Sequence, residues 1–288
     1  MTETITLRAS TMRCEIVPAL GGSLAGLWFG EHEVLRHQPA AQMQSGLDGA
    51  SYPLVPYSNR VGYRQLRWDG HDYVLAPNFP QEPHCIHGVG WMRAWDAERM
   101  SASQARLTYH HVADDYWPFA FETEQVFTLD AHTLEMHISI TNRAAKAVPA
   151  GLGWHPYFAK SAQTHVRFSS NSRWEMGADM LPTHALAHSG LDTDCANLTV
   201  DHCFEGWAGA LQLQSGPLRV EVSSDLSRLV VFTTPARDSI AIEPVSHVNN
   251  ALSLAEQGEA TLEALGMQVL QPGQSMRATM RIRVEEVV

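Results

Sequence analysis

The sequence predicts an all-β fold, a large antiparallel β-sandwich. More than a dozen short stretches of the 288-residue chain alternate apolar and polar residues or run apolar over strand length. Turns rich in Gly, Pro, Asn or Asp separate these stretches, and long helical periodicity is nearly absent. No linker, internal repeat or low-complexity tract divides the chain, so we expect a single domain over residues 1–288.

The amino-terminal third is expected to form short strands at residues 5–7, 14–17 and 23–29 and in a hairpin over residues 64–73. Trp68-Asp69-Gly70-His71 supplies the turn of that hairpin. Prolines make residues 77–83 an irregular segment.

Three long strands are expected in the middle of the chain, at residues 105–111, 119–129 and 134–140. In the last of them apolar Leu134, Met136, Ile138 and Ile140 alternate with polar residues, which predicts one face in a core. We expect the histidines on these strands and their turns to lie at the surface: His110, His111, His132 and His137.

The second half of the chain is expected to continue as strands, with one polar loop at residues 191–198 and one short helix or polar loop within residues 252–263. The expected strands are residues 166–168, 172–176, 210–214, 218–223, 229–233, 239–245, 267–270 and 276–284.

Charge and composition exclude several partners. The chain has 31 acidic and 20 basic residues, a net charge of −11, and no Lys/Arg cluster, which disfavours a nucleic-acid partner. It has no apolar run approaching the roughly 18 residues of a membrane span, and its amino terminus lacks a basic start and an apolar run. We therefore expect a soluble, cytoplasmic protein without a membrane partner. We also expect it to be a monomer or a homodimer.

The cysteines and clustered histidines do not predict a metal site. The four cysteines form no C-x-x-C pair, which is typical of reduced thiols. His84 and His87 share one face only if residues 84–91 form a helix, and the neighbouring prolines and glycines disfavour one. We expect neither a metal nor another cofactor.

Residues 151–158, Gly-Leu-Gly-Trp-His-Pro-Tyr-Phe, contain the first candidate functional residue, His155. Pro156 favours extended backbone at His155 and removes the next ladder donor, so the chain is expected to leave a strand and turn here. The glycines and aromatic residues suggest a close approach beside a flat apolar surface, as in a site for a sugar ring. The alternative, a buried histidine in an aromatic corner, is equally compatible with this stretch.

Two loops contain further candidates. Residues 52–62 place Asn59-Arg60 among apolar and aromatic residues, where a permanently charged guanidinium suits sugar hydroxyls or a ring oxygen; a structural arginine that binds loop carbonyls fits equally. His87-Gly88 indicates a histidine at a loop apex, with glycine allowing a ligand or backbone to come close. Trp91 and Trp95 are expected in the core rather than as sugar platforms.

Two carboxylates complete the set. Glu243 ends an apolar strand directly before proline, where partial desolvation would disfavour its charged form and suit it to acid or base work. The alternative is an edge-strand glutamate in water. Asp201 lies beside His202 between apolar residues, and can accept bonds from sugar hydroxyls or cap a turn.

Taken together and in this order, the chain resembles the aldose 1-epimerase (galactose mutarotase) family. The resemblance covers nearly the whole chain through six short motifs at residues 59–62, 87–91, 153–158, 201–204, 242–244 and 270–273. It implies a β-supersandwich fold and an enzyme that interconverts the α and β anomers of a free monosaccharide. It further implies that Glu243 is the general base and His155 the general acid, that His87 assists at the ring oxygen, and that the sugar is bound by Asn59, Arg60 and Asp201.

The chain departs from the family pattern in two places. His87-Gly88-Val89-Gly90-Trp91 replaces a His-Gly-Gly with a downstream Gly-Phe, and residues 248–251 (Val-Asn-Asn-Ala) replace the usual Pro-Asp-Ala run. These changes leave the identity of the sugar open. A phosphorylated hexose is not expected, because Arg60 has no arginine cluster beside it. The alternative functions are a glycoside hydrolase, which would use Asp201 and Glu243, and a non-catalytic sugar-binding protein.

Overall fold

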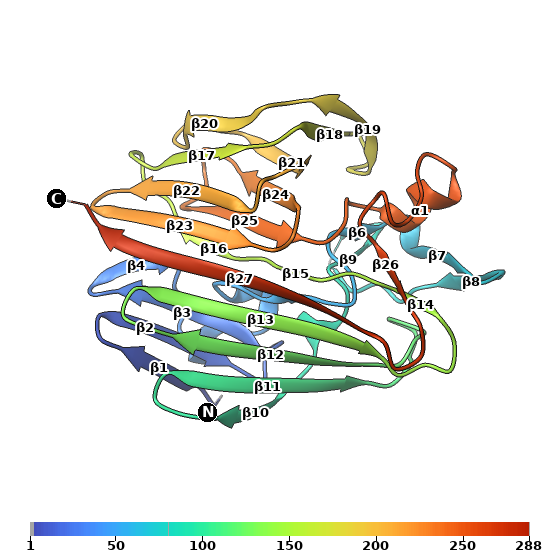
Figure 1. Cartoon of the computed structure of the whole chain (residues 1–288), viewed down its shortest axis with the longest axis horizontal. Coiled ribbons are helices and arrows are strands. Elements are labelled where there is room, and N and C mark those ends of the chain that lie inside the picture. Colours follow the sequence, from blue (N-terminus) through green and yellow to red (C-terminus); the bar gives the residue numbers. More distant parts are fainter. Residues whose placement is uncertain (1–2, 80, 288) are drawn as a thin grey trace.

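The computed structural model describes residues 3–79 and 81–287, and nearly all of their regular structure is β-strand. Two large antiparallel sheets stack face to face, which confirms the predicted all-β sandwich (Figure 1). In the view of Figure 1 the nine-stranded sheet lies in front and the twelve-stranded sheet behind it. The hairpin of β7 (Gln65–Trp68) and β8 (His71–Val74) and the helix α1 (Ala251–Glu256) project on the right.

The twelve-stranded sheet runs in the order β1 (Ile5–Ala9), β2 (Met12–Val17), β3 (Ser23–Phe29), β4 (His32–Leu35), β16 (Tyr157–Ala159), β25 (Ser239–Val245), β24 (Arg228–Thr233), β21 (Val200–Glu205), β18 (Ser172–Met176) and β19 (Pro182–Ala187). The remaining two strands of this sheet are β15 (Gly153–Trp154), which pairs with β25, and β5 (Pro53–Leu54), which pairs with β15.

The nine-stranded sheet runs in the order β10 (Asp96–Arg99), β11 (Gln104–His111), β12 (Phe121–Leu129), β13 (Thr133–Asn142), β27 (Ser275–Glu286), β23 (Leu218–Ser224), β22 (Ala210–Ser215), β17 (His165–Ser169) and β20 (Gly190–Asp194). Two further pairs are β6 (Arg60–Val61) with β9 (Cys85–Ile86), and β14 (Val148–Ala150) with β26 (Gln268–Leu270). Single-turn 3₁₀ helices occur at η1 (Ala40–Gln42), η2 (Gly46–Asp48), η3 (Gly62–Arg64) and η4 (Gly90–Met92).

The long strands bury every second side chain between the two sheets. Burial alternates along β12, β13 and β27, and Phe127, Met136 and Met280 occupy one register row across them. The predicted core face of residues 134–140 is confirmed, because all four of its apolar side chains are buried. From the twelve-stranded sheet, the Phe204 ring reaches the Phe168 ring of β17.

Strands that lack an alternating pattern of apolar residues were not predicted from the sequence. Residues 191–198, expected as a polar loop, begin inside β20, which pairs with β17. β20 is the last strand of its sheet, and β10 and β19, which also had no predicted counterpart, likewise end a sheet. Strands at these positions have one solvated edge and mostly exposed or half-buried side chains, so they need no apolar pattern.

The expected surface position of His111 is wrong. Its side chain is buried, its ring stacks on Phe121, and its imidazole Nε2 lies 2.8 Å from the carbonyl oxygen of Trp117. His110 and His132 are exposed and His137 is half-buried, as expected for residues at the surface. His110 and His111 differ in burial because successive side chains of β11 point to opposite faces of the sheet.

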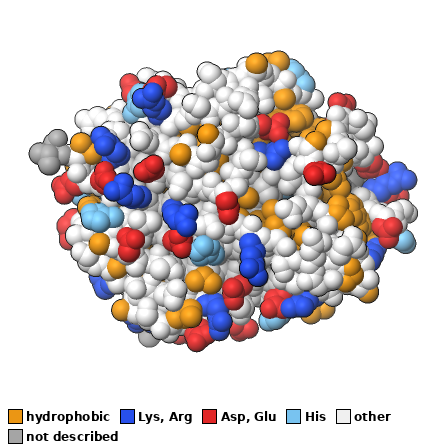
Figure 2. Space-filling view, viewed as in Figure 1, with side chains coloured by type: hydrophobic (Ala, Val, Ile, Leu, Met, Phe, Trp, Pro, Cys, Tyr) orange, Lys and Arg blue, Asp and Glu red, His pale blue; other side chains and the backbone are white. Residues whose placement is uncertain are grey.

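The outer surface carries mixed charge. Figure 2 shows acidic and basic side chains interspersed over the face turned to the viewer, with no large patch of one sign. Cross-strand ion pairs such as Arg281 with Glu135 and Arg143 with Glu122 account for part of this pattern. Among the described residues, no helix has the length and apolar character needed to cross a membrane.

Candidate active site

One cavity of about 280 Å³ brings together all six residues predicted to form a site. Its lining includes Asn59, Arg60, His87, His155, Asp201 and Glu243. Asp201 and Glu243 come from strands β21 and β25, Arg60 opens β6, and the other three lie in loops next to short strands. Residues separated by up to 184 positions in the chain therefore meet in one place.

The floor of the cavity is a row of side chains across four neighbouring strands. Asp201 of β21 is paired with Phe232 of β24, and Ala241 of β25 stands between Phe232 and Tyr157 of β16. Directly paired residues point to the same face of a sheet, and Glu243, two positions along β25, shares that face.

The strand register places His155 opposite Glu243. β15 ends just before His155 and pairs with β25 at Val245, whereas β16 begins just after Pro156 and pairs with β25 at Ala241. Position 155 therefore meets position 243, and the His155 Nε2 lies 3.1 Å from the Glu243 Oε1. His155 is 5% exposed and Glu243 is 2% exposed. The possibility of an edge-strand glutamate in water is excluded, because β25 lies in the interior of the sheet.

The glycines before His155 make room for protein, not for a sugar ring. A Cβ at Gly151 would lie 2.2 Å from the Cδ2 of His247, and a Cβ at Gly153 would lie 2.7 Å from the carbonyl oxygen of Pro244. His247 is itself fixed, because its Nε2 accepts a hydrogen bond from the Ser58 N–H at 3.0 Å. The interpretation of these glycines as part of a sugar surface is therefore corrected: they allow the His155 loop to lie against β25.

Gly151→Ala is expected to lower the free energy of unfolding by about 3 kcal/mol or more, because the methyl group overlaps His247 and disrupts its buried hydrogen bond. Urea denaturation measures this loss. Gly216→Ala is the control, since its methyl group meets open space and only the left-handed backbone adds a cost of about 1 kcal/mol. Equal losses in the two variants would contradict the packing argument.

Burial controls the protonation of the His155 and Glu243 pair. Desolvation raises the pKa of Glu243 well above its usual range, with the charge of Asp201 adding to the rise and that of Arg60 opposing it. Desolvation lowers the pKa of His155 well below its usual range, and repulsion by His87, when that ring is protonated, and by the charge of Arg36 lowers it further. Both shifts favour the neutral forms, so a single proton on the pair resides on the Glu243 carboxyl in preference to the His155 imidazole.

His87 is held as a neutral hydrogen-bond donor. It has a left-handed backbone (φ 64°) in a reciprocal contact with Asn59: the His87 N–H donates to the Asn59 carbonyl at 2.8 Å, and the Asn59 N–H donates to the His87 Nδ1 at 3.1 Å. Desolvation lowers the pKa of His87 to about 3. Because Nδ1 accepts a hydrogen bond, the proton of the neutral ring resides on Nε2.

The same tautomer disfavours a metal ion here. Nitrogen and oxygen atoms of His87, His155 and Glu243 lie within 4.8 Å of one another, close enough to surround a cation. A neutral imidazole has one free nitrogen lone pair, and that of His87 is engaged by the Asn59 N–H. The remaining nitrogen of His87 carries a proton, so binding a metal would require either its loss or rearrangement of the loop.

Arg60 belongs to a hydrogen-bonded group on another wall of the cavity. Its guanidinium lies 3.3 Å from the Glu82 Oε1 and donates to the Asn59 Oδ1 at 3.3 Å. The Arg60 Nε is buried and has no partner in the described chain. Asp201 completes this wall, and burial raises the pKa of its carboxyl. This wall thus offers a buried donor without a partner, the Arg60 Nε, and a half-buried acceptor, the Asp201 carboxyl.

Sequence reasoning missed the aromatic residues that fix His155. Its ring packs against both Tyr52 (centroids 4.7 Å apart, stacked) and Tyr157 (4.5 Å). Behind Tyr157, the Arg36 guanidinium lies 3.6 Å from the ring centroid and donates to the carbonyls of Gly49 and Leu47. Tyr52 and Tyr157 stood inside the motifs already singled out, but nothing in the sequence marked Arg36.

Five other lining residues were also not predicted: Phe79, Glu82, Ile86, Phe232 and Arg237. The tryptophans are absent from the described lining, and Trp91, Trp95 and Trp154 are buried, as expected for core residues. Phe79 and Phe232 are therefore the aromatic side chains available to meet an apolar ring face beside the two tyrosines.

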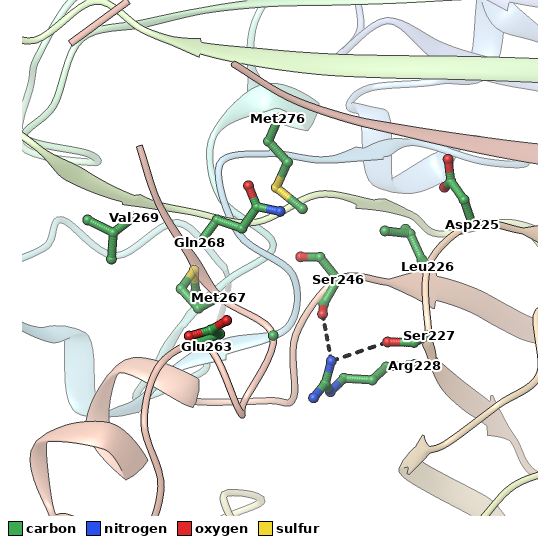
Figure 3. Close-up of a pocket in the computed structure, with 11 residues that line it drawn as sticks. Asp225, Leu226, Ser227, Arg228, Ser246, Glu263, Met267, Gln268, Val269 and Met276 are labelled. Carbon is green, nitrogen blue, oxygen red and sulfur yellow. Dashed lines mark hydrogen bonds between the residues drawn. The ribbon is translucent and has the colours of Figure 1, made fainter. Parts of the chain in front are cut away.

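A second and larger hollow, of about 540 Å³, has different chemistry (Figure 3). It is lined in part by Leu226, Met267 and Met276. Figure 3 shows its one arginine, Arg228, bonded to the Ser246 carbonyl and the Ser227 hydroxyl. Arg228 also donates to Glu205, so its charge is already satisfied by protein groups. The smaller cavity is therefore the stronger candidate for a catalytic site.

Two curated proteins of Escherichia coli K12 are related to the chain over most of its length. YphB is 28% identical over 289 residues, covering 92% of this chain and 93% of its own. YihR is 27% identical over 269 residues, covering 87% of this chain and 86% of its own.

Solved structures share the fold. A crystal structure of a protein from Escherichia coli K12 superimposes with a TM-score of 0.89 at 25% identity over 99% of both chains. A galactose mutarotase-like protein from Clostridium acetobutylicum has a TM-score of 0.85 at 16% identity, covering 99% of this chain and 95% of that one. The model of the aldose 1-epimerase family matches residues 3–283. Because that match spans nearly the whole chain and both sheets, the protein belongs to the aldose 1-epimerase family.

Proposed function

We propose that this protein interconverts the α and β anomers of a free aldose. The observation that carries the proposal is the buried contact of 3.1 Å between the His155 Nε2 and the Glu243 Oε1 at the cavity. The other polar atoms of this pair, His155 Nδ1 and Glu243 Oε2, are buried without a partner in the described chain. A polyhydroxylated ligand supplies the hydrogen bonds that such atoms lack.

The proposed reaction moves the single proton of the pair through the sugar. In the reactive form His155 is an imidazolium and Glu243 a carboxylate. Glu243 takes the proton from the anomeric hydroxyl while His155 gives its proton to the ring oxygen. The bond between C1 and the ring oxygen breaks, and C1 becomes the carbonyl carbon of the open-chain aldehyde.

Rotation about the C1–C2 bond then presents the other face of the carbonyl. Glu243 returns its proton to the carbonyl oxygen, His155 removes the proton from the attacking hydroxyl, and the ring closes as the other anomer. The pair begins and ends with one proton, so this sequence of steps consumes no cofactor. General acid and general base each contribute about 10²–10⁴-fold to such a rate.

The other lining residues are proposed to bind the sugar. The neutral His87 offers its Nε2–H to the ring oxygen region. Burial lowers its pKa to about 3, and in the described chain it lacks the ion pair with Glu243 through which His155 can receive a proton. Asn59, Arg60 and Asp201 offer donors and an acceptor to the hydroxyls.

Polarimetry of freshly dissolved α-D-glucose and α-D-galactose, with and without the protein, tests the proposal. We expect the optical rotation to reach equilibrium faster with the protein, in proportion to its concentration. An unchanged rate on a panel of aldoses, together with measurable sugar binding, would instead indicate a sugar-binding protein. Release of reducing sugar from a glycoside would indicate a hydrolase.

The pH dependence of kcat/KM is expected to be bell-shaped, because only the singly protonated pair is active. The lowered pKa of His155 places the acid limb below pH 6.5, since a second proton binds the pair only there. The raised pKa of Glu243 places the alkaline limb well above pH 4.5. Polarimetric rates from pH 3 to 10, corrected at each pH for spontaneous mutarotation, measure both limbs. A single limb centred at pH 6.5 would show that His155 titrates as it does in water.

A further inference from the structure

Arg237 lines the catalytic cavity without a carboxylate partner. Arg237 forms no ion pair with any residue of the described chain. This is notable because the acidic residues of the protein outnumber its basic residues. Its guanidinium instead lies 4.4 Å from the ring centroid of Phe232, which is part of the cavity floor. Arg60, by contrast, is paired with Glu82.

The loop that holds Arg237 is anchored. Residues 234–238 join β24 to β25, the strand of Glu243. The Lys160 ammonium group donates to the Thr234 carbonyl at 2.7 Å, and the Lys160 N–H donates to the Asp238 carbonyl at 2.7 Å. Both ends of the loop are thereby tied to the residue that follows β16. Arg237 is exposed, yet the backbone that presents it is fixed beside the cavity.

Arg237 and Arg60 act on overlapping parts of the site. The charge of Arg60 lowers the pKa of Glu243, His87 and Asp201, whereas the charge of Arg237 lowers the pKa of His155, Tyr157 and Asp201. Arg237 therefore lies near His155 and Tyr157, a part of the site on which Arg60 has no such effect, as well as near Asp201.

A second cation reinforces the Arg237 side. Arg36 lies behind Tyr157, and its guanidinium is bonded to neutral carbonyls rather than to a carboxylate. Arg60 is paired with Glu82, and Asp201 lies close enough to feel the charges of both Arg60 and Arg237. In the described chain Arg60 thus has a carboxylate in an ion pair, whereas Arg36 and Arg237 have none.

We propose that the sugar substrate of this protein carries an anionic group, a carboxylate or a phosphate monoester, that Arg237 binds. This inference rests on the proposed mutarotase function and specifies its substrate class. An arginine fork donates two hydrogen bonds to such a group, and the Phe232 ring keeps the guanidinium plane in position. The expectation against a phosphorylated hexose assumed that Arg60 was the only arginine at the site, and Arg237 removes that assumption.

The test compares D-glucose, D-glucuronate and D-glucose 6-phosphate as substrates for wild type and Arg237→Gln. We expect wild type to show a higher kcat/KM for at least one anionic sugar than for glucose, and this preference to shrink about fivefold to tenfold in Arg237→Gln. The preference of wild type should also fall as salt is raised. The two anionic sugars separate a carboxylate site from a phosphate site. Arg219→Gln, an exposed arginine on β23 of the other sheet, is the control and should keep the wild-type preference.

Equal preference ratios in wild type and Arg237→Gln would overturn the inference while leaving the mutarotase function intact. Isothermal titration calorimetry with glucuronate and glucose 6-phosphate keeps the two proposals distinguishable. If no aldose is turned over faster, the mutarotase proposal fails; tighter binding of an anionic sugar than of glucose, lost in Arg237→Gln, would still support the anion site. Equal binding of all three sugars would overturn it.

Discussion

Glu243→Gln is expected to reduce kcat for mutarotation by about 10³-fold or more, because an amide of the same shape cannot take the proton from the anomeric hydroxyl. KM should change little, since glutamine occupies the same volume on β25 and still offers polar atoms to the sugar. Polarimetry at saturating sugar, with the spontaneous rate subtracted, measures the loss.

The same substitution should not unfold the protein. Glu243 has a raised pKa in the folded state, so the stability associated with its protonated form is complete below pH 4.5 and is lost as pH rises through the folded-state pKa. Glutamine has no such loss. We therefore expect the Tm of Glu243→Gln to equal or exceed that of wild type at pH 7, and the difference to grow with pH above 4.5.

Glu221→Gln, on β23 of the other sheet, is the matched control and should retain wild-type kcat. A Glu243→Gln variant that keeps full activity would remove Glu243 from the mechanism. A variant that is inactive but has a much lower Tm than wild type would mean that the carboxyl is structural.

His155→Asn is expected to reduce kcat by about 10²–10⁴-fold, because no other histidine in the described lining forms an ion pair with Glu243. The double variant Glu243→Gln/His155→Asn should be no slower than the slower single variant. One proton serves both residues, so removal of either already ends the transfer, and the two losses do not multiply.

His110→Asn, at an exposed position of β11, is the control for the histidine substitution and should leave kcat unchanged. Losses that multiply in the double variant would show that His155 and Glu243 act in independent steps. That result would contradict the shared proton while leaving both residues in the site.

Periodicity predicted those parts of the fold in which burial forces an apolar pattern. The strands through Met136 and Glu243 were recognisable because one or both of their faces are buried. β10, β19 and β20 were not, because a strand at the end of a sheet satisfies its backbone on one side only and exposes most of its side chains. His111 was misplaced because its partners, Phe121 and the Trp117 carbonyl, depend on tertiary packing.

Site residues that stand inside a short sequence motif could be predicted. Site residues whose position depends on strand register or on the path of a loop could not. His155 and Glu243 each left an equal alternative open locally, and only their pairing across β25 removes it. Arg237 stands in a polar turn that resembles any other turn in the sequence. Its place at the cavity follows from the bonds that Lys160 makes to the loop, which no local pattern encodes.

The register of β15 and β16 against β25 positions some residues of the cavity, whereas others stand on loops. The two groups therefore differ in how easily they can be substituted. The position of His155 opposite Glu243, the pair proposed to transfer protons, is set by strand pairing, where a slip of one residue would turn each side chain to the opposite face. Arg237, which is proposed to select the substrate class, stands on a loop, and loops accept substitution and insertion. A lineage with this architecture can therefore acquire a new substrate through loop mutations alone, without passing through an intermediate that has lost its reaction.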